Sequence, residues 1–249
     1  MTTLSNKGTF SQRRPVLAVI IIELLLLVAM FAAGAYAQMN QLDYTDPVLI
    51  AFIPIALVLM VYQTIRRKWA ALGFESIRNI PSKNWIFYLP LVLVLGINCM
   101  NGFKSTSISS LLYFIGVTLL VGFVEETIYR GLILRTLLAK GVTAAVTTSS
   151  ILFAVTHILN ALSGQSLWDT ILQIVYALLV GLVLALLIIM NNNILPLITF
   201  HFIHNLIQFI SPSNSFWYGN IIVIAVIALH AIWLIVSLRK VPVQAAIAG

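Results

Sequence analysis

The chain has 249 residues, of which 61% are hydrophobic and only 8% are charged, and its mean hydropathy is +1.04. Ordinary soluble domains carry about 25% charged residues, so this composition excludes a water-soluble globule and predicts a membrane protein. The 14 Lys and Arg outnumber the 7 Asp and Glu, but no basic run exceeds Arg66-Arg67-Lys68, so we expect no nucleic-acid partner. The single Cys99 excludes an internal disulfide and a multi-cysteine metal site.

Eight stretches of the sequence are apolar and long enough to be candidate membrane spans, for which about 20 residues are needed. In chain order they cover residues 15–38, 47–65, 86–101, 109–139, 142–162, 168–190, 194–210 and 220–238. Polar, turn-rich segments separate them. The fold predicted is therefore all-α, a polytopic membrane helix bundle of about eight transmembrane helices.

The basic residues outside the spans predict how the bundle is oriented. If the N-terminus is cytoplasmic, the cytoplasmic side receives Lys7, Arg13, Arg14, Arg66, Arg67, Lys68, Arg78, Lys83, Lys140, Arg239 and Lys240. Only Lys104 falls on the outer side, together with Asp43, Asp46 and Asp169. Because cytoplasmic loops carry an excess of Lys and Arg, we expect both termini in the cytoplasm, with the cell membrane as the location.

The first span could also be read as a secretion signal, because Ala35-Tyr36-Ala37 resembles a signal-peptidase site. Its apolar run from Pro15 to Ala33 exceeds the 7–15 residues usual for a signal peptide. An uncleaved membrane anchor is therefore expected.

Ionisable residues inside the predicted spans concentrate in the second half of the chain. The fourth span contains Glu125-Glu126-Thr127-Ile128-Tyr129-Arg130, the fifth Phe153-Ala154-Val155-Thr156-His157, and the seventh His201-Phe202-Ile203-His204-Asn205. Charged groups are costly at this depth and usually face the interior of a bundle, so they mark a candidate functional site. By contrast, we expect Glu23 and His230, on flanking spans, to be structural.

Helix geometry predicts which of these residues meet. Residues four apart share a face, so Glu126 should pair with Arg130, and Glu125, pointing about 100° away, should have a different partner. If the fourth helix is continuous, Glu125 lies about 21 Å from the cytoplasmic surface and His157 about 22 Å. The same rise per residue places His201 only about 10 Å from the cytoplasmic surface, unless its helix is tilted or starts late.

The motifs Glu-Glu-x-x-x-Arg, Phe-x-x-x-His and His-x-x-x-Asn, in this order on the fourth, fifth and seventh spans, resemble those of the CPBP family of intramembrane proteases. This family includes the CAAX prenyl endopeptidases and the Abi-like bacteriocin-processing or self-immunity proteins. The resemblance implies a four-span catalytic core at 109–210. Three N-terminal spans with a cytoplasmic link (1–108) and a C-terminal span with a tail (211–249) would flank it.

The resemblance also implies roles for individual residues: Glu125 and His157 activate the hydrolytic water, and His201 and Asn205 bind the substrate carbonyl. These residue types suit peptide hydrolysis, which needs a base for water, donors for the oxyanion and a proton for the leaving amine. Glu126, Arg130 and His204 are expected in supporting positions. The partners expected are a membrane-associated peptide or protein substrate and the lipid bilayer, with the oligomeric state open.

Zinc is the main alternative in the mechanism, because Glu125, His157 and His201 could form a His₂Glu site. A metal-free, glutamate-dependent mechanism without any cofactor is favoured, since the sequence has no His-Glu-x-x-His and places Asn205 where another ligand would be expected. Two other classes of function stay open: a proton-coupled transporter and a non-catalytic peptide-binding immunity protein.

Overall fold

The computed structural model describes residues 9–162, 165–212 and 217–239, and all regular structure in these ranges is helical. Its main helices are α2 (Pro15–Met39), α3 (Asp46–Ile65), α4 (Leu89–Cys99), α5 (Ile108–Glu126), α7 (Val142–Thr156), α9 (Leu167–Asn191), α10 (Leu195–Ile210) and α11 (Trp217–Arg239). Shorter elements are the α-helices α1 (Phe10–Arg13), α6 (Arg135–Leu137) and α8 (Leu159–Leu162), and the 3-10 helices η1 (Ala70–Leu72), η2 (Ile77–Asn79), η3 (Ser82–Tyr88) and η5 (Leu138–Lys140). The remaining element, η4 (Thr127–Leu134), is a π-helix. The predicted polytopic helical bundle is confirmed.

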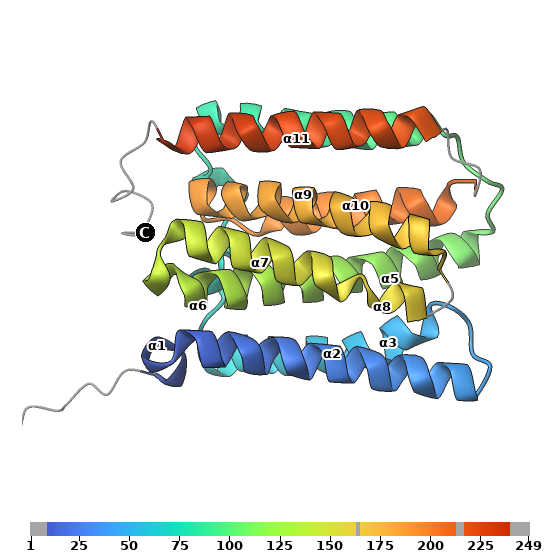
Figure 1. Cartoon of the computed structure of the whole chain (residues 1–249), viewed down its shortest axis with the longest axis horizontal. Coiled ribbons are helices and arrows are strands. Elements are labelled where there is room, and N and C mark those ends of the chain that lie inside the picture. The colour runs from blue at the N-terminus through green and yellow to red at the C-terminus, as the bar shows by residue number, and fades with distance from the viewer. Residues whose placement is uncertain (1–8, 163–164, 213–216, 240–249) are drawn as a thin grey trace, which may run out of the picture.

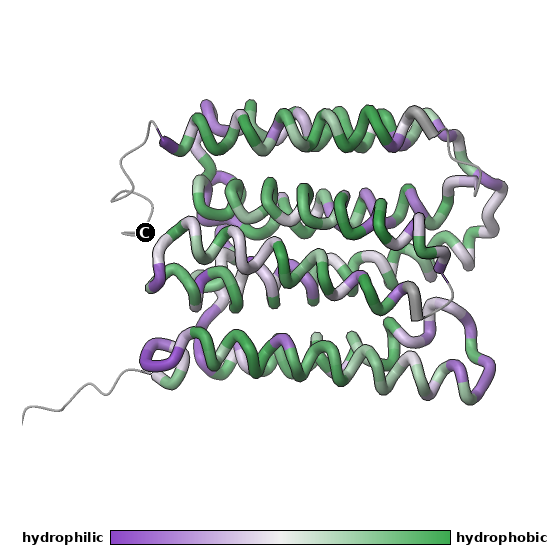
Figure 2. The backbone as a smooth tube through the Cα atoms, viewed as in Figure 1, coloured by the Kyte–Doolittle hydropathy of each residue, from purple (hydrophilic) through white to green (hydrophobic). Residues whose placement is uncertain are grey.

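Six helical segments of the described chain are long and apolar enough to cross a membrane. The fifth and seventh predicted spans correspond to shorter apolar helices, α7 and α10. Figure 2 shows apolar residues along the lengths of the helices and polar residues mostly at the two ends of the bundle. The chain is thus an integral, multi-pass membrane protein, although only six of the eight predicted spans reach full length.

The helices stack in layers, with α2 and α3 on one side, α4 and α11 on the other, and α5, α7, α9 and α10 between them (Figure 1). In the central layer α7 packs against α9 and α5 packs against α10. These four helices correspond to the fourth to seventh predicted spans.

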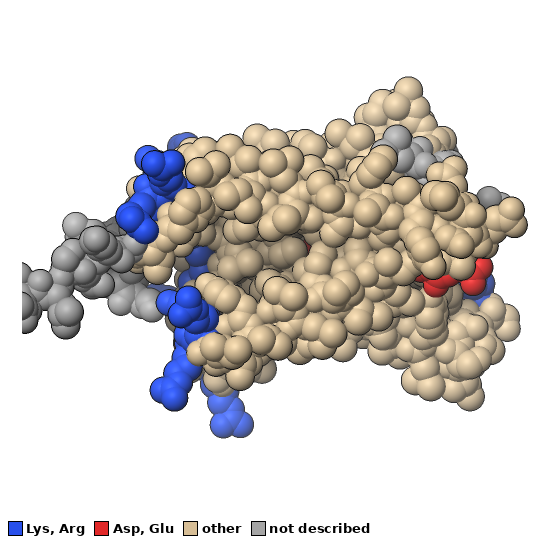
Figure 3. Space-filling model, turned by 90° about the horizontal axis from the view of Figure 1, so that it is seen from below, with Lys and Arg blue, Asp and Glu red and all other residues tan. Residues whose placement is uncertain are grey.

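Charge is distributed unevenly between the two ends of the bundle. The first residues of α2 and the last of α11 lie at the same end (Figure 1), and on the face shown in Figure 3 most of the visible Lys and Arg gather there. Acidic residues are visible at the opposite end (Figure 3). Lys7 and Lys240, two of the basic residues used for the predicted orientation, lie outside the described residues.

The fourth span is one continuous helical segment over Ile108–Lys140, as predicted, but it is not uniformly α-helical. Its middle, Thr127–Leu134, is a π-helix that begins directly after Glu126 and contains Arg130. A π-turn inserts an extra residue in the hydrogen-bonding ring and frequently occurs at functional sites. None of the sequence patterns predicted this change in helix type.

The fifth span, predicted as a helix to residue 162, is interrupted at His157. The side-chain Nδ1 of His157 lies 2.9 Å from the carbonyl oxygen of Phe153, which is the acceptor that the backbone N–H of His157 would use in an α-helix. That N–H bonds instead to Ala154, 3.2 Å away, and α7 ends at Thr156. The histidine therefore competes with the helix for a carbonyl and occupies its C-terminal cap.

Candidate active site

The predicted ion pair of the fourth span is present and completely buried. Glu126 Oε2 lies 3.2 Å from Arg130 Nε, and neither side chain is exposed to solvent. The Arg130 guanidinium also lies over the Phe153 ring, 4.4 Å from its centroid, and donates from Nη2 to the carbonyl of Gly181 at 3.4 Å. Arg130 thus joins the fourth span to α7 and α9.

His201 contacts both glutamates. Its Nδ1 is 2.9 Å from Glu126 Oε1, and its Nε2 is 3.5 Å from Glu125 Oε2. As expected, Glu125 has a partner other than Arg130, but that partner, His201, also bonds to Glu126. The two glutamates do point in different directions, but a single imidazole placed between them presents one nitrogen to each.

The depth calculated for His201 was too shallow, and two features explain how it meets the glutamates. Ile194, the starting point of that count, is not at the surface: it is fully buried. Its N–H donates at 2.8 Å to the carbonyl of Gly73 in the polar link, residues 66–88 between α3 and α4. At Gly122 of α5 the absence of a side chain also lets α10 approach closely. A Cβ atom there would lie 3.2 Å from Ile198 O and 3.7 Å from His201 Cβ.

His157 lies on the Phe153 side of its helix, as predicted, with the two ring centroids 5.1 Å apart in an edge-to-face arrangement. Phe153 makes the same kind of contact with His201 at 5.9 Å. The hydrogen bond from Nδ1 to the Phe153 carbonyl leaves Nε2 as the second functional nitrogen of His157. His157 and Glu125 line the same cavity, but no direct bond between them is found among the described residues.

His204 and Asn205 form a hydrogen-bonded chain with Tyr176 of α9. The Tyr176 hydroxyl lies 2.6 Å from His204 Nε2, and His204 Nδ1 lies 3.4 Å from Asn205 Oδ1. If the tyrosine donates to Nε2, Nδ1 carries the proton and donates to the asparagine oxygen. This order leaves the Asn205 NH₂ group for other acceptors.

The four predicted catalytic residues, Glu125, His157, His201 and Asn205, line one cavity of about 570 Å³. His204 lines it as well, whereas Glu126 and Arg130 lie behind its wall. Helices outside the central layer also contribute to the walls, including α4 through Asn98 and α11 through Asn220. These contributions could not be predicted, because neutral polar residues in flanking spans belong to none of the motifs.

The residues named for the zinc alternative do not form a three-ligand set. In the described part of the chain no three His, Cys, Asp or Glu side chains converge as metal ligands would. Both ring nitrogens of His201 already face carboxylates. The arrangement of these side chains therefore does not fit a zinc ion.

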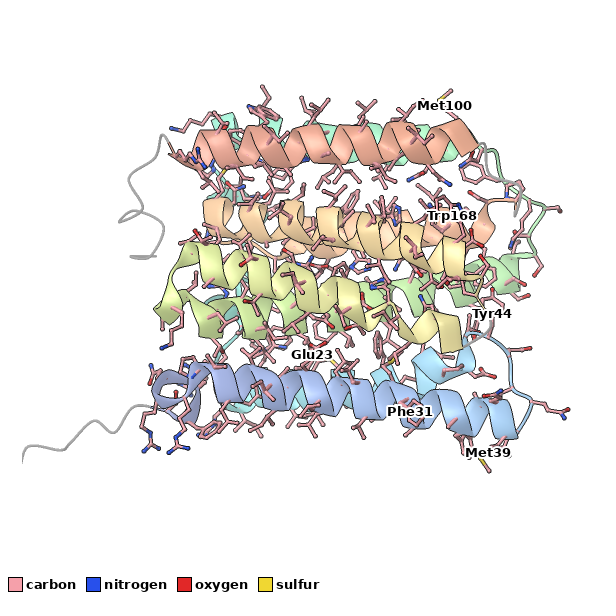
Figure 4. The ribbon with its side chains drawn as sticks, in the orientation of Figure 1. Glu23, Phe31, Met39, Tyr44, Met100 and Trp168 are labelled. Atoms are coloured by element: carbon pink, nitrogen blue, oxygen red, sulfur yellow. The ribbon has the colours of Figure 1, made fainter. Side chains whose placement is uncertain are left out.

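Glu23, expected to be structural, reaches the edge of this site. It lies on the inner side of α2, whereas Phe31 and Met39 of the same helix point outward (Figure 4). Its Oε1 accepts a hydrogen bond from the Thr156 hydroxyl at 3.1 Å, and Thr156 lines the cavity beside His157. Glu23 is the only charged residue in the 25-residue apolar helix α2, and this feature of the sequence could have identified it as part of the site.

Comparison with known families supports the class of protein that this site defines. Residues 107–207 match a family model described as type II CAAX prenyl endopeptidase Rce1-like, and all three motifs lie inside the match. This part of the chain is therefore similar to the CPBP and CAAX proteases, the family that its motifs predicted. No curated protein matches the chain. The family implies a membrane protease with a peptide or protein substrate, and it favours neither the transporter nor the immunity-protein alternative.

Proposed function

We propose that the protein is a membrane-embedded endopeptidase that hydrolyses a peptide bond with water activated by Glu125 and His157, without a metal ion. The observation that carries the proposal is the convergence of Glu125, His157, His201 and Asn205 on one cavity inside the bundle. A carboxylate, two imidazoles and a carboxamide supply the base, the acid and the neutral donors that amide hydrolysis requires.

In the first step Glu125 takes a proton from water while the water oxygen attacks the substrate carbonyl carbon. The electrons of the C=O bond move to its oxygen, and this oxyanion accepts hydrogen bonds from the Asn205 NH₂ group and from His201. Such donors stabilise the transition state because they are fixed before the charge develops. When the intermediate collapses, the C=O bond re-forms and the C–N bond breaks, while the proton held by Glu125 passes through Nε2 of His157 to the leaving amine.

The contacts of His201 support its role as a donor. His201 Nδ1 is hydrogen-bonded to Glu126, and its Nε2 lies 3.5 Å from Glu125 Oε2. An imidazolium in this position, together with Arg130, balances the charges of the two glutamates. Once Glu125 has accepted the proton of water, its attraction for the protonated Nε2 weakens, and the oxyanion formed in the same step accepts a hydrogen bond from Nε2–H.

The activity is tested with purified protein in lipid nanodiscs and a library of internally quenched peptides. We expect cleavage by the wild type and none by Glu125→Gln or His157→Ala. Glu75→Gln is the matched control, because Glu75 lies in the polar link and bonds to Asn79 rather than to the site. Activity of Glu125→Gln equal to that of the control would refute the proposed role of Glu125.

The metal-free mechanism is tested separately by elemental analysis and chelation. We expect far less than one zinc per chain in active protein and full activity after stringent chelation. In a zinc enzyme, His201→Ala would lose both metal and activity, and zinc would restore chelated wild type. That combined result would overturn the mechanism but not the protease assignment.

A further inference from the structure

The first long helix contributes a buried carboxylate that the mechanism above does not use. Glu23 of α2 is only 6% exposed, and Met30, seven residues further along the same face, lines the cavity. Within the described residues, Glu23 forms no ion pair with Lys, Arg or His, and its Oε2 has no hydrogen-bond partner. A carboxylate without a counter-ion is costly inside a membrane helix, so the contact of its other oxygen requires an explanation.

The Thr156 hydroxyl is held by residues from two other helical elements. It donates to Glu23 Oε1 at 3.1 Å, and it also lies 3.0 Å from the carbonyl oxygen of Leu152, a common contact of threonine within a helix. A hydroxyl has one hydrogen, and here that hydrogen faces these two acceptors. In the third contact of the hydroxyl, with Tyr129, the tyrosine is therefore the donor. Hydrogen bonds run from Tyr129 to Thr156 and from Thr156 to Glu23.

Tyr129 is itself fixed in place. It belongs to the π-helix η4 and is only 1% exposed. Its ring contacts Phe153 edge to face at 5.2 Å, and its carbonyl accepts a hydrogen bond from Ser149 Oγ at 2.8 Å. The hydrogen bonds from Tyr129 to Glu23 thus join α2, the fourth span and α7, and they meet at Thr156, the last residue of α7.

Thr156 directly precedes His157, whose ring must be held in one tautomer. The Phe153 carbonyl can only accept, so in the neutral ring Nδ1 of His157, 2.9 Å away, carries the hydrogen and Nε2 keeps its lone pair. A free lone pair on Nε2 is what the proposed proton transfer to the leaving amine requires. Because α7 ends at Thr156, no continuing α-helix fixes the histidine, and the Thr156 hydroxyl is the anchored group next to it.

We propose, building on the protease function above, that Glu23 is a positioning residue for His157. By accepting a hydrogen bond from Thr156 it fixes the end of α7, so that the His157 ring stays bonded to the Phe153 carbonyl through Nδ1 and transfers the proton at Nε2. Glu23 does not line the cavity, and it acts as a hydrogen-bond acceptor rather than as a base. Glutamine, which has the same size and keeps an acceptor oxygen, should therefore replace it.

The first test observes the ring of His157 without any substrate. Protein carrying isotope-labelled histidine is placed in lipid nanodiscs, and the NMR signals of His157 are identified by their loss in His157→Ala. We expect one tautomer, with the hydrogen on Nδ1, in the wild type and in Glu23→Gln, and a mixture of tautomers in Glu23→Leu and Thr156→Val. His157 signals that neither Glu23→Leu nor Thr156→Val changes would overturn the inference.

The second test compares the cleavage of the quenched peptides. Glu23→Leu and Thr156→Val should lower kcat by about 10- to 100-fold with little change in KM, because a small displacement of a catalytic group has an effect of this order. The conservative Glu23→Gln should retain most of the activity. Thr147→Val is the matched control, since it removes an exposed threonine hydroxyl that bonds to Thr143 within α7. A Glu23→Gln protein as impaired as Glu23→Leu would show that the charge itself acts, and the inference would be wrong.

Thermal stability separates positioning from a purely structural role. Leu suits an apolar membrane helix better than Glu does, so Glu23→Leu should melt no lower than the wild type although its kcat falls. A loss of activity together with a lower melting temperature would make Glu23 structural and overturn the inference. If the wild type cleaves no peptide, the protease proposal fails, while the NMR signals of His157 still decide whether Glu23 positions that ring.

Discussion

At the scale of single residues, the site depends on contacts that hold three charged groups and an imidazole together inside the bundle. These groups belong to Glu125, Glu126, Arg130 and His201. Glu126 has no solvent exposure and is bonded to both Arg130 and His201. A buried ion pair adds little stability compared with apolar packing, but removing one partner leaves an uncompensated charge. The site is therefore expected to be sensitive to any change that alters its charge balance.

Arg130→Met should lower the stability of the protein in detergent by about 3–5 kcal/mol, because it strands Glu126 in a buried position. Thermal unfolding measures the effect, with the exposed Arg66→Met as the control. Exchanging Glu126 and Arg130 should not recover the lost stability, since His201 needs a carboxylate at position 126. An Arg130→Met protein as stable as the control would contradict the assignment.

Tyr176→Phe should lower kcat about tenfold with little change in KM, less than the 10²–10³ typical of losing an oxyanion donor itself. The hydroxyl acts indirectly: it holds His204, which in turn holds the oxygen of Asn205. Tyr113→Phe is a matched control, because it removes a comparable hydrogen bond, to Thr45, away from the cavity. Equal kinetics for the two variants would show that Asn205 is not oriented through Tyr176.

Some of these contacts could be predicted from the sequence, and others could not. Glu126 with Arg130 and Phe153 with His157 follow from a spacing of four residues, which depends only on local helix geometry. The bridge from His201 to both glutamates depends on where α10 begins beneath the polar link. That start is fixed by a long-range hydrogen bond, from Ile194 to Gly73, which no local pattern encodes.

At the scale of helices, the site depends on how closely α5 and α10 approach. Gly122 sits at that crossing, where an added Cβ would meet the backbone of α10 at 3.2 Å and 3.3 Å. Contacts this tight require a shift of a few tenths of an ångström, and backbone atoms cannot move independently of their helix. Catalytic geometry is sensitive to shifts of that order.

Gly122→Ala should therefore reduce activity, and Gly122→Leu should abolish it and lower the melting temperature. Gly116→Ala is the control on the same helix, because nothing lies within 4 Å of a Cβ at that position. It should leave activity intact and raise stability by up to about 1 kcal/mol through better helix propensity. Full activity of Gly122→Leu would show that the contact between α5 and α10 does not position His201.

At the scale of the whole molecule, the two ends of the bundle differ in charge, and this difference predicts sidedness. In a Cys99→Ser background, single cysteines at Gln12 and Asn79 should react with impermeant reagent only after the cells are permeabilised. Cysteines at Asp43 and Ser105 should react in intact cells. All four positions are exposed at the surface of the molecule. The reverse pattern would invert the predicted orientation.

The composition of the fourth span also bears on how the protein is made. Glu125, Glu126 and Arg130 lie near the middle of Ile108–Lys140, and each charged residue adds about 2.5–3.5 kcal/mol to the cost of inserting a helix from the translocon into lipid. Arg130 offsets one of these charges within the same helix, but His201 leaves the ribosome 75 residues after Glu126. We therefore expect the nascent fourth helix to be held at the translocon, or beside other protein, until α10 has been synthesised, so that the residues proposed for catalysis also set the order of biogenesis.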